Sequence, residues 1–168
     1  MSIVNYASHT QIVSPNTRNT IRHAIRILSI DPATKNLNVR LEDRCGKKTN
    51  LVKNFKVELG DAYIKKLEEL YMSIDHLLFE CDMIIIEKQM YNNFKAVEVA
   101  MYSVGYFQQR YKDKNFLPDV YLVSPKLKSK LFGVSSKTTQ LKKWSPIMAN
   151  KLSIYRDDSV TCKLLMEA

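Results

Sequence analysis

Two short apolar runs in this chain each end abruptly in a carboxylate. Residues 83–86 are Met-Ile-Ile-Ile and precede Glu87, and residues 27–30 are Ile-Leu-Ser-Ile and precede Asp31. Apolar runs of this length are typical of strands buried on both faces of a sheet. Ligands of open α/β sheets gather at the carboxyl ends of such strands. The pattern therefore predicts two acids at one edge of a sheet, where a hard cation could bind for metal-assisted phosphate chemistry.

The rest of the hydrophobic pattern predicts an α/β fold with a mixed central sheet and helices on both faces. Strands are expected at 25–31, 36–43, 52–58, 83–87 and 120–123, and helices at about 61–80, 94–112, 145–154 and 157–168. In the second helix, Val97, Met101, Val104 and Gln108 share one face. We expect this face to pack on the sheet, with a dimer contact as the alternative.

The ends and the composition of the chain define its organisation. Residues 1–24 are polar and contain no acid, so we expect a flexible N-terminal extension. Residues 25–168 are expected to form a single domain, which is the usual outcome for a chain of 168 residues. The three cysteines are scattered, which indicates reduced thiols in an intracellular compartment rather than a disulfide framework or a zinc site.

The charge of the chain narrows the range of partners. Lys and Arg number 26 against 17 acids, a net charge of +9, which favours a polyanion such as nucleic acid or an anionic membrane surface. No apolar run approaches the ~20 residues that a bilayer span needs, so no membrane insertion is expected. The first residues also lack the pattern of a secretory signal.

A third group of acids completes a possible metal site. The pair Asp157 and Asp158 is expected to open the last helix, and two-metal phosphoryl chemistry needs several convergent carboxylates to hold two Mg²⁺ or Mn²⁺ ions. Each acid also has a simpler interpretation. Asp31 precedes Pro32 and could be a turn residue, Asp157 could cap the last helix, and Glu87 could end its strand in solvent.

Three segments around these acids resemble the motifs of RuvC-type Holliday junction resolvases. Residues 29–36, Ser-Ile-Asp-Pro-Ala-Thr-Lys-Asn, are similar to the first-strand pattern S-I-D-x-G-x-K-N. Residues 84–89, Ile-Ile-Ile-Glu-Lys-Gln, are similar to the second motif, and residues 155–160, Tyr-Arg-Asp-Asp-Ser-Val, resemble the D-D-x-x-D helix. Within this family the chain most resembles the poxvirus-type resolvases of large cytoplasmic DNA viruses, and it is also similar to the mitochondrial yeast enzymes.

The resemblance implies an RNase H-like fold and a homodimeric, Mg²⁺-dependent endonuclease, for which Mn²⁺ could substitute. Its substrate would be a four-way junction or other branched DNA, at a cytoplasmic site of virus replication if the source is viral. Asp31 would be the first metal ligand, Glu87 the second and Asp158 the third, with Asp157 as a possible substitute.

Two positions depart from the family pattern. Ala33 stands where Gly is usual, and Thr161 stands where the last acid of the D-D-x-x-D motif is expected. A Thr hydroxyl is a neutral, weak ligand, so the loss removes about one negative charge from the metal site. The chain could therefore be an active nuclease or a junction-binding protein without activity. An RNase H-type nuclease of RNA–DNA hybrids is a third possibility.

A basic stretch supplies candidate phosphate contacts. No acid occurs from Val120 to Arg156, and such a segment could contact phosphates or simply be a solvated face. The predicted nucleic-acid contacts are Lys35, Lys88, Lys126, Lys128, Lys130, Lys137, Lys142 and Lys143. Lys126 follows a predicted strand end, where it could stabilise charge developing on a phosphate.

Aromatic residues near the predicted site could stack on unpaired bases. Tyr91 lies in a polar loop and is the best candidate. Phe94 is a second possibility, whereas Phe132 is expected to pack in the core.

Overall fold

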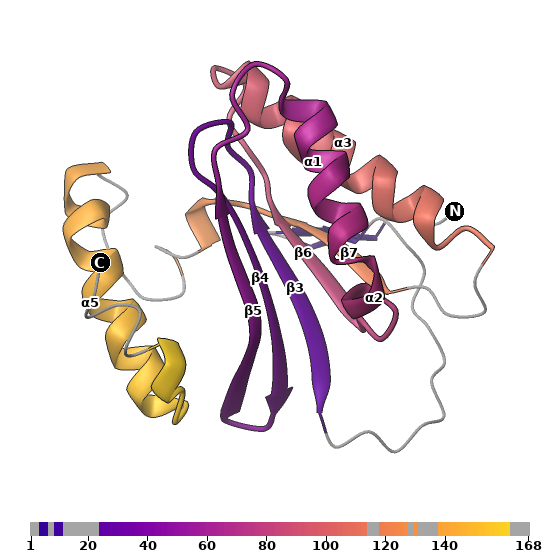
Figure 1. The fold of residues 1–168 in the computed structure, drawn as a ribbon. Coiled ribbons are helices and arrows are strands. Elements are labelled where there is room, and N and C mark those ends of the chain that lie inside the picture. The colour runs from indigo at the N-terminus through magenta and orange to yellow at the C-terminus, as the bar shows by residue number, and fades with distance from the viewer. Residues whose placement is uncertain are drawn as a thin grey trace.

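The computed structural model describes residues 4–6, 9–11, 24–113, 118–127, 130 and 138–161. Within these ranges a mixed sheet has the strand order β1-β2-β7-β6-β3-β4-β5 (Figure 1). The strands are β1 (Val4–Tyr6), β2 (His9–Gln11), β3 (Ile25–Asp31), β4 (Leu37–Cys45), β5 (Lys48–Val57), β6 (Met83–Glu87) and β7 (Asp119–Val123). All five predicted strands are present, as β3 to β7.

The sheet combines an antiparallel meander with a parallel half. β3, β4 and β5 pair antiparallel, and the β4–β5 hairpin turns at Gly46, whose φ of 57° favours glycine. β6 pairs parallel with both β3 and β7. The carboxyl ends of β3, β6 and β7 therefore meet at one edge of the sheet.

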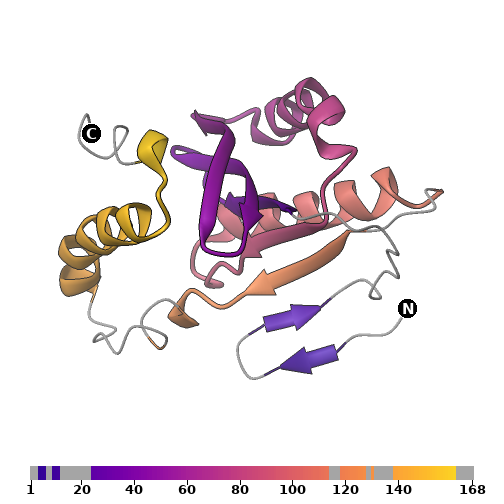
Figure 2. The ribbon, with the colours of Figure 1, turned by 90° about the horizontal axis from the view of Figure 1, so that it is seen from below.

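Two short strands extend the sheet beyond β7 (Figure 2). β2 pairs antiparallel with β7, and β1 pairs antiparallel with β2. Both strands lie within residues 1–24, where the sequence analysis predicted a flexible extension and no strand. Three-residue segments with no run of alternating apolar side chains carry too little periodicity to be recognised as strands.

One face of the sheet is covered by α1 (Tyr63–Ser73), α2 (Asp75–Leu78) and α3 (Phe94–Arg110) (Figure 1). The hydrophobic core lies between these helices and the sheet and includes Leu28, Ile30, Ile84 and Ile86. The predicted helix at 61–80 is interrupted at Ile74, which ends α1 and precedes α2 while its side chain stays buried.

The predicted inner face of α3 is confirmed at Val104 and wrong at Met101, while Val97 and Gln108 are half-buried. The buried residues are Ala96, Val99, Ala100, Ser103, Val104 and Phe107, and Met101 is 55% exposed. Small side chains therefore also face the core, and Ser103 forms a hydrogen bond of 2.6 Å with the Tyr71 hydroxyl.

On the opposite side of the sheet lies α5 (Thr138–Tyr155), so helices flank both faces as predicted (Figure 1). α5 begins seven residues before the predicted start at 145, and Pro146 lies inside it rather than near its beginning. The backbone N–H of Thr49 on edge strand β5 donates to the carbonyl of Arg156, at 3.4 Å. In the part of the chain that the structure describes, no helix has the length and apolar character that a membrane crossing requires.

Candidate functional site

Asp31 and Glu87 lie side by side at the carboxyl ends of β3 and β6. Ile30 and Ile86 are register partners in this parallel pair, so the next residues of the two strands are neighbours at the usual strand spacing of about 4.8 Å. Ile30 and Ile86 point into the core beneath α1 and α3. Because side chains alternate along a strand, both acids point to the opposite face of the sheet. The predicted shared edge for these two acids is confirmed.

The end of β7 brings further groups to the same edge. Val123 is the register partner of Glu87, and its carbonyl accepts a hydrogen bond of 2.8 Å from the Lys88 N–H. Three residues beyond Val123, the exposed Lys126 begins a helical turn. Lys126 therefore follows the strand adjacent to Glu87, where the sequence analysis expected it.

Other predicted nucleic-acid contacts are exposed. Lys35 lies in the loop after Asp31, and Lys88 directly follows Glu87. Tyr91 is 82% exposed and Phe94 is 74% exposed, so both aromatic rings are accessible. Lys130 is also exposed. Lys128, Lys137 and Phe132 lie outside the described residues, as do the side chains of Lys142 and Lys143.

Asp157 does not open the last helix, as the sequence analysis expected, but helps to end α5. Its φ is 55°, in the left-handed region, its N–H donates to the Ile154 carbonyl, and the next N–H, of Asp158, donates to the Ser153 carbonyl. These bonds form a Schellman motif, in which a left-handed residue closes the helix. The backbone of Asp157 therefore has a structural role at this turn.

Asp158 is the residue that caps the following helical turn. Its Oδ1 accepts a hydrogen bond of 3.0 Å from the Thr161 N–H, which is the bond of an N-cap side chain to the third helical residue. Its Oδ2 accepts a bond of 2.5 Å from the Thr161 hydroxyl. Thr161, which stands in place of the expected acid, thus donates twice to Asp158.

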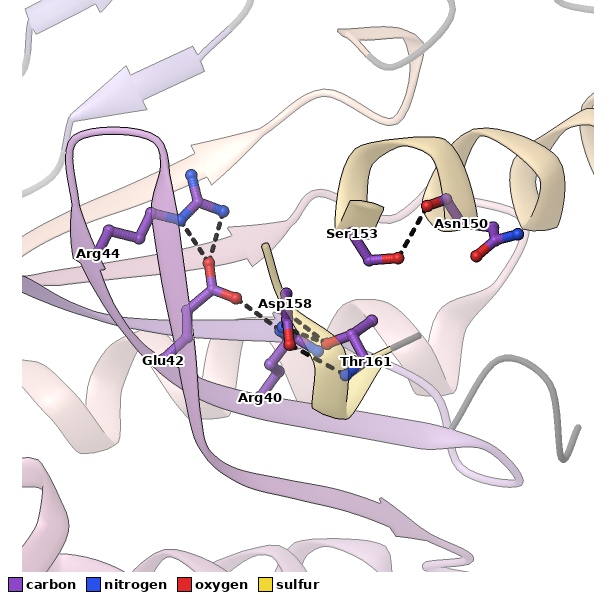
Figure 3. A network of polar contacts seen from close by, with 7 residues as sticks. All are labelled: Arg40, Glu42, Arg44, Asn150, Ser153, Asp158 and Thr161. Carbon is purple, nitrogen blue, oxygen red and sulfur yellow. Dashed lines mark hydrogen bonds and ion pairs between the residues drawn. The ribbon is translucent and has the colours of Figure 1, made fainter. Parts of the chain in front are cut away.

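Arg40 of β4 joins this cap to the sheet (Figure 3). Its Nη2 donates to Asp158 Oδ2 and to Thr161 Oγ1, each at 2.9 Å. The Asp158 side chain is only 4% exposed. Burial raises the pKa of Asp158, but the hydrogen bonds from Thr161 and the charge of Arg40 outweigh it, so the pKa is lowered.

The same guanidinium binds a second buried acid. Arg40 Nε donates to Glu42 Oε2 at 2.6 Å, and Arg44 Nε donates to the other oxygen of Glu42 at 2.5 Å. The Glu42 side chain is 3% exposed. Arg40, Glu42 and Arg44 are alternate residues of β4 and share the sheet face that carries Asp31 and Glu87.

Asp31 and Glu87 fit a divalent cation, because adjacent carboxylates supply the oxygen ligands and the charge that Mg²⁺ prefers. Asp158 does not fit as a third ligand in this arrangement, since both of its oxygens accept hydrogen bonds and one is paired with Arg40. Across the described ranges no three His, Cys, Asp or Glu side chains come close enough together to hold a metal ion. The structure thus brings two of the three predicted ligands together.

The backbone conformation explains why Ala33 can stand where the family pattern has Gly. Asp157 is the only residue other than glycine with a positive φ in the described part of the chain, so Ala33 adopts a conformation open to any L residue. The loop after Asp31 is tied down by the Thr34 carbonyl, which accepts the Leu59 N–H at 2.7 Å. This loop does not require glycine at position 33.

Sequence reasoning missed Arg40 and Glu42. The segment 37–42, Leu-Asn-Val-Arg-Leu-Glu, alternates apolar and polar residues and so places Asn38, Arg40 and Glu42 on one face. The sequence therefore already indicated that a basic and an acidic residue of this strand lie on the predicted metal-binding face. The partnership with Asp158 was not predictable, because it joins residues 118 positions apart.

The architecture, a mixed sheet with three antiparallel and then two parallel strands flanked by helices, is an RNase H-like fold. No protein-family model matches the sequence, and no curated protein matches it. Solved structures do resemble it.

The structure of RuvC from Thermus thermophilus superposes with a TM-score of 0.56 at 16% identity, over 84% of this chain and 92% of that one. T. thermophilus RuvC in complex with a Holliday junction substrate gives a TM-score of 0.54 at 12% identity, over 84% and 91%. The fowlpox virus resolvase in complex with Holliday junction DNA gives 0.51 at 17% identity, over 84% and 86%. At such identities the likeness is one of fold.

Proposed function

We propose that this chain is a Mg²⁺-dependent, structure-selective DNA endonuclease that resolves four-way junctions, of the RuvC-like type. The observation that carries the proposal is the position of Asp31 beside Glu87 at the carboxyl ends of adjacent parallel strands. The order of these two acids in the sequence is that of the resolvase motifs, and the fold is one that two solved junction complexes share.

Asp31 and Glu87 are the residues that would hold the cation, with Mn²⁺ as a possible substitute. A bound divalent ion supplies charge stabilisation and an activated water for phosphodiester hydrolysis. The protein would position the two carboxylates side by side and bind the phosphate next to them. Lys35, Lys88 and Lys126 surround this edge and are exposed, so each can neutralise a backbone phosphate.

A homodimer is part of the proposal, because a junction cut symmetrically needs two active sites. Phe94 and Met101 of α3 lie seven residues apart on one helix face and are 74% and 55% exposed. Val97 lies between them on the same face and is half-buried. This stripe, Phe94, Val97 and Met101, is turned away from the core and is the surface on which we expect a second copy to pack.

The place of action follows from the same motifs and from the thiols. Cys45 and Cys81 are both free, in keeping with a reducing compartment. The motif resemblance to poxvirus-type resolvases favours a cytoplasmic site of virus replication.

A second candidate function is junction binding without cleavage. It is favoured by the engagement of Asp158 with Arg40 and Thr161, which removes one of the three expected carboxylates from the metal site. A site with two carboxylates holds Mg²⁺ more weakly than one with three or four. In this case the fold and the lysines would serve recognition alone.

One set of assays separates these functions. Purified protein is incubated with a labelled four-way junction, a linear duplex or an RNA–DNA hybrid, with Mg²⁺ or Mn²⁺, beside the isosteric variant Glu87→Gln. The proposal expects symmetric nicks in the junction that Glu87→Gln abolishes. Tight junction binding without nicks, together with nicking by Thr161→Asp, would establish the binding function instead. Preferential cutting of the hybrid would contradict both.

A further inference from the structure

Three arginines gather where the β4–β5 hairpin meets the end of α5. Arg40 and Arg44 project from the same face of β4. Arg156 directly follows α5, and its carbonyl accepts the N–H of Thr49, the cross-strand partner of Arg44. This backbone contact places Arg156 beside Arg44, against the β4–β5 hairpin.

The cluster carries more positive than negative charge. Glu42 binds Arg40 and Arg44, and Asp158 binds Arg40, so three guanidiniums share two carboxylates. Among the described residues the Arg156 guanidinium forms no ion pair with an acid. Its partial burial lowers its pKa, and the charges of Arg44 and Arg40 lower it further. The cluster would therefore be stabilised by an anion from outside.

The two carboxylates that pair with this cluster are buried. Glu42 and Asp158 are 2% and 4% exposed, so their carboxylates lie beneath the arginines. At the hairpin tip, Lys47 lies over the Tyr155 ring, with its Nζ 5.1 Å from the ring centroid. In Figure 3 one nitrogen of the Arg44 guanidinium points away from Glu42. An approaching ligand thus meets these cations and not the two paired carboxylates, while the exposed Asp157 follows Arg156 at the left-handed turn.

We propose that Arg44 and Arg156 bind a backbone phosphate of nucleic acid, at a site distinct from the Asp31–Glu87 edge. The planar guanidinium presents paired N–H groups that match phosphate oxygens, which makes Arg better suited than Lys to hold one phosphate in place. The identity of the ligand as DNA rests on the proposed function. A membrane headgroup is the less fitting partner, because Glu42 holds Arg44 in a fixed position that a fluid surface does not need.

The position of the site defines what it would hold. Asn38 is the register partner of Asp31, and Arg44 lies six residues further along β4, which corresponds to about 20 Å at ~3.3 Å per residue. One strand of a duplex advances ~3.4 Å per phosphate, so this phosphate would lie about six nucleotides from one at the metal edge. The site would hold a duplex arm and not the point of strand exchange.

Salt-dependent binding tests the proposal. Affinity for a labelled four-way junction is measured by fluorescence anisotropy across roughly 50 to 200 mM KCl, because each phosphate contact adds about one unit to the slope of log affinity against log salt. Arg156→Gln and Arg44→Gln should each reduce that slope by about one. Lys65→Gln removes the same charge from an 80% exposed position on α1 and should leave the slope unchanged.

Melting temperatures of the variants show whether a change in DNA binding is caused by a loss of folding. Arg156→Gln removes repulsion within the cluster and should not lower the melting temperature, whereas a purely structural role predicts that it does. Arg156→Lys should recover most of the slope, since it restores the charge. The proposal is overturned if Arg156→Gln binds the junction with the affinity and slope of the wild type, or if the variant loses binding to anionic vesicles but not to DNA.

The outcomes also separate this site from the proposed nuclease. If the wild type never cuts the junction while Arg156→Gln still weakens binding, the nuclease proposal fails and the phosphate site stands. If the wild type cuts and Arg156→Gln has no effect on binding, the phosphate site fails alone. A wild type that binds no nucleic acid at all overturns both.

Discussion

Arg40 on β4 and Asp158 after α5 form an ion pair with an Nη2–Oδ2 distance of 2.9 Å. The pair connects the central sheet to the turn that follows the last described helix, and Arg40 binds Glu42 at the same time. Both carboxylates are almost fully buried. Separating this turn from the sheet would leave buried charges without partners, which costs free energy. The ion pair therefore holds the turn against the sheet face that carries Asp31 and Glu87.

Breaking the pair should destabilise the fold. Asp158→Asn keeps a capping side chain but loses the charge, and it should lower the free energy of unfolding by about 1–3 kcal/mol. Arg40→Gln leaves two buried carboxylates with fewer donors and should cost about 3–5 kcal/mol. Urea denaturation of both variants and of the double variant measures the coupling between them. A coupling below about 0.5 kcal/mol would contradict the pair.

The stabilising effect of Asp158 should depend on pH. Folding holds the pKa of Asp158 below its ordinary value of 3.8, so the unfolded chain binds the proton first as the pH falls. The contribution is then complete above about pH 5 and is lost as the pH falls through the lowered folded pKa. The difference in unfolding free energy between the wild type and Asp158→Asn should therefore shrink between about pH 5 and pH 2. A difference independent of pH would show that Asp158 acts without its charge.

Metal binding should distinguish the three predicted ligands. Millimolar Mg²⁺ or Mn²⁺ should raise the melting temperature of the wild type, because a ligand of the folded state stabilises it. Glu87→Gln and Asp31→Asn should abolish this rise. Asp158→Asn should retain most of it, since its carboxylate is already engaged with Arg40 and Thr161. If Asp158→Asn loses the rise in melting temperature to the same extent as Glu87→Gln, Asp158 is a metal ligand after all.

The strands of the central sheet were predictable because their apolar runs are short and sharply bounded. The run at 83–87 matches β6 residue for residue, and the run at 25–31 matches β3. The inner face of α3 was predicted only in part, because Val99, Val104 and Phe107 share it with the small residues Ala96, Ala100 and Ser103. Small residues show where a helix packs closely only once its partner surface is known.

The candidate site also has a part that was predictable from the sequence and a part that was not. Asp31 and Glu87 were predictable as neighbours, because parallel strands bring their carboxyl ends to one edge. The role of Asp158 was not predictable, since it depends on Arg40, a residue from a distant strand. Local patterns predict where a side chain emerges from its own element. They do not predict which charged residue from a distant part of the sequence will pair with that side chain.

The exposed stripe on α3 supplies a test of the dimer. Met101→Lys places a charge within the stripe formed by Phe94, Val97 and Met101, so it should shift the protein from dimer to monomer in sedimentation velocity. Since Met101 is 55% exposed, the stability of the monomer should change by no more than about 0.5 kcal/mol. Met72→Lys is the matched control, because Met72 is 64% exposed on α1 and lies outside the stripe. If Met101→Lys stays dimeric, or if both variants dissociate alike, α3 is not the dimer surface. A monomer that still binds the junction but no longer nicks both strands would tie symmetric cleavage to this surface.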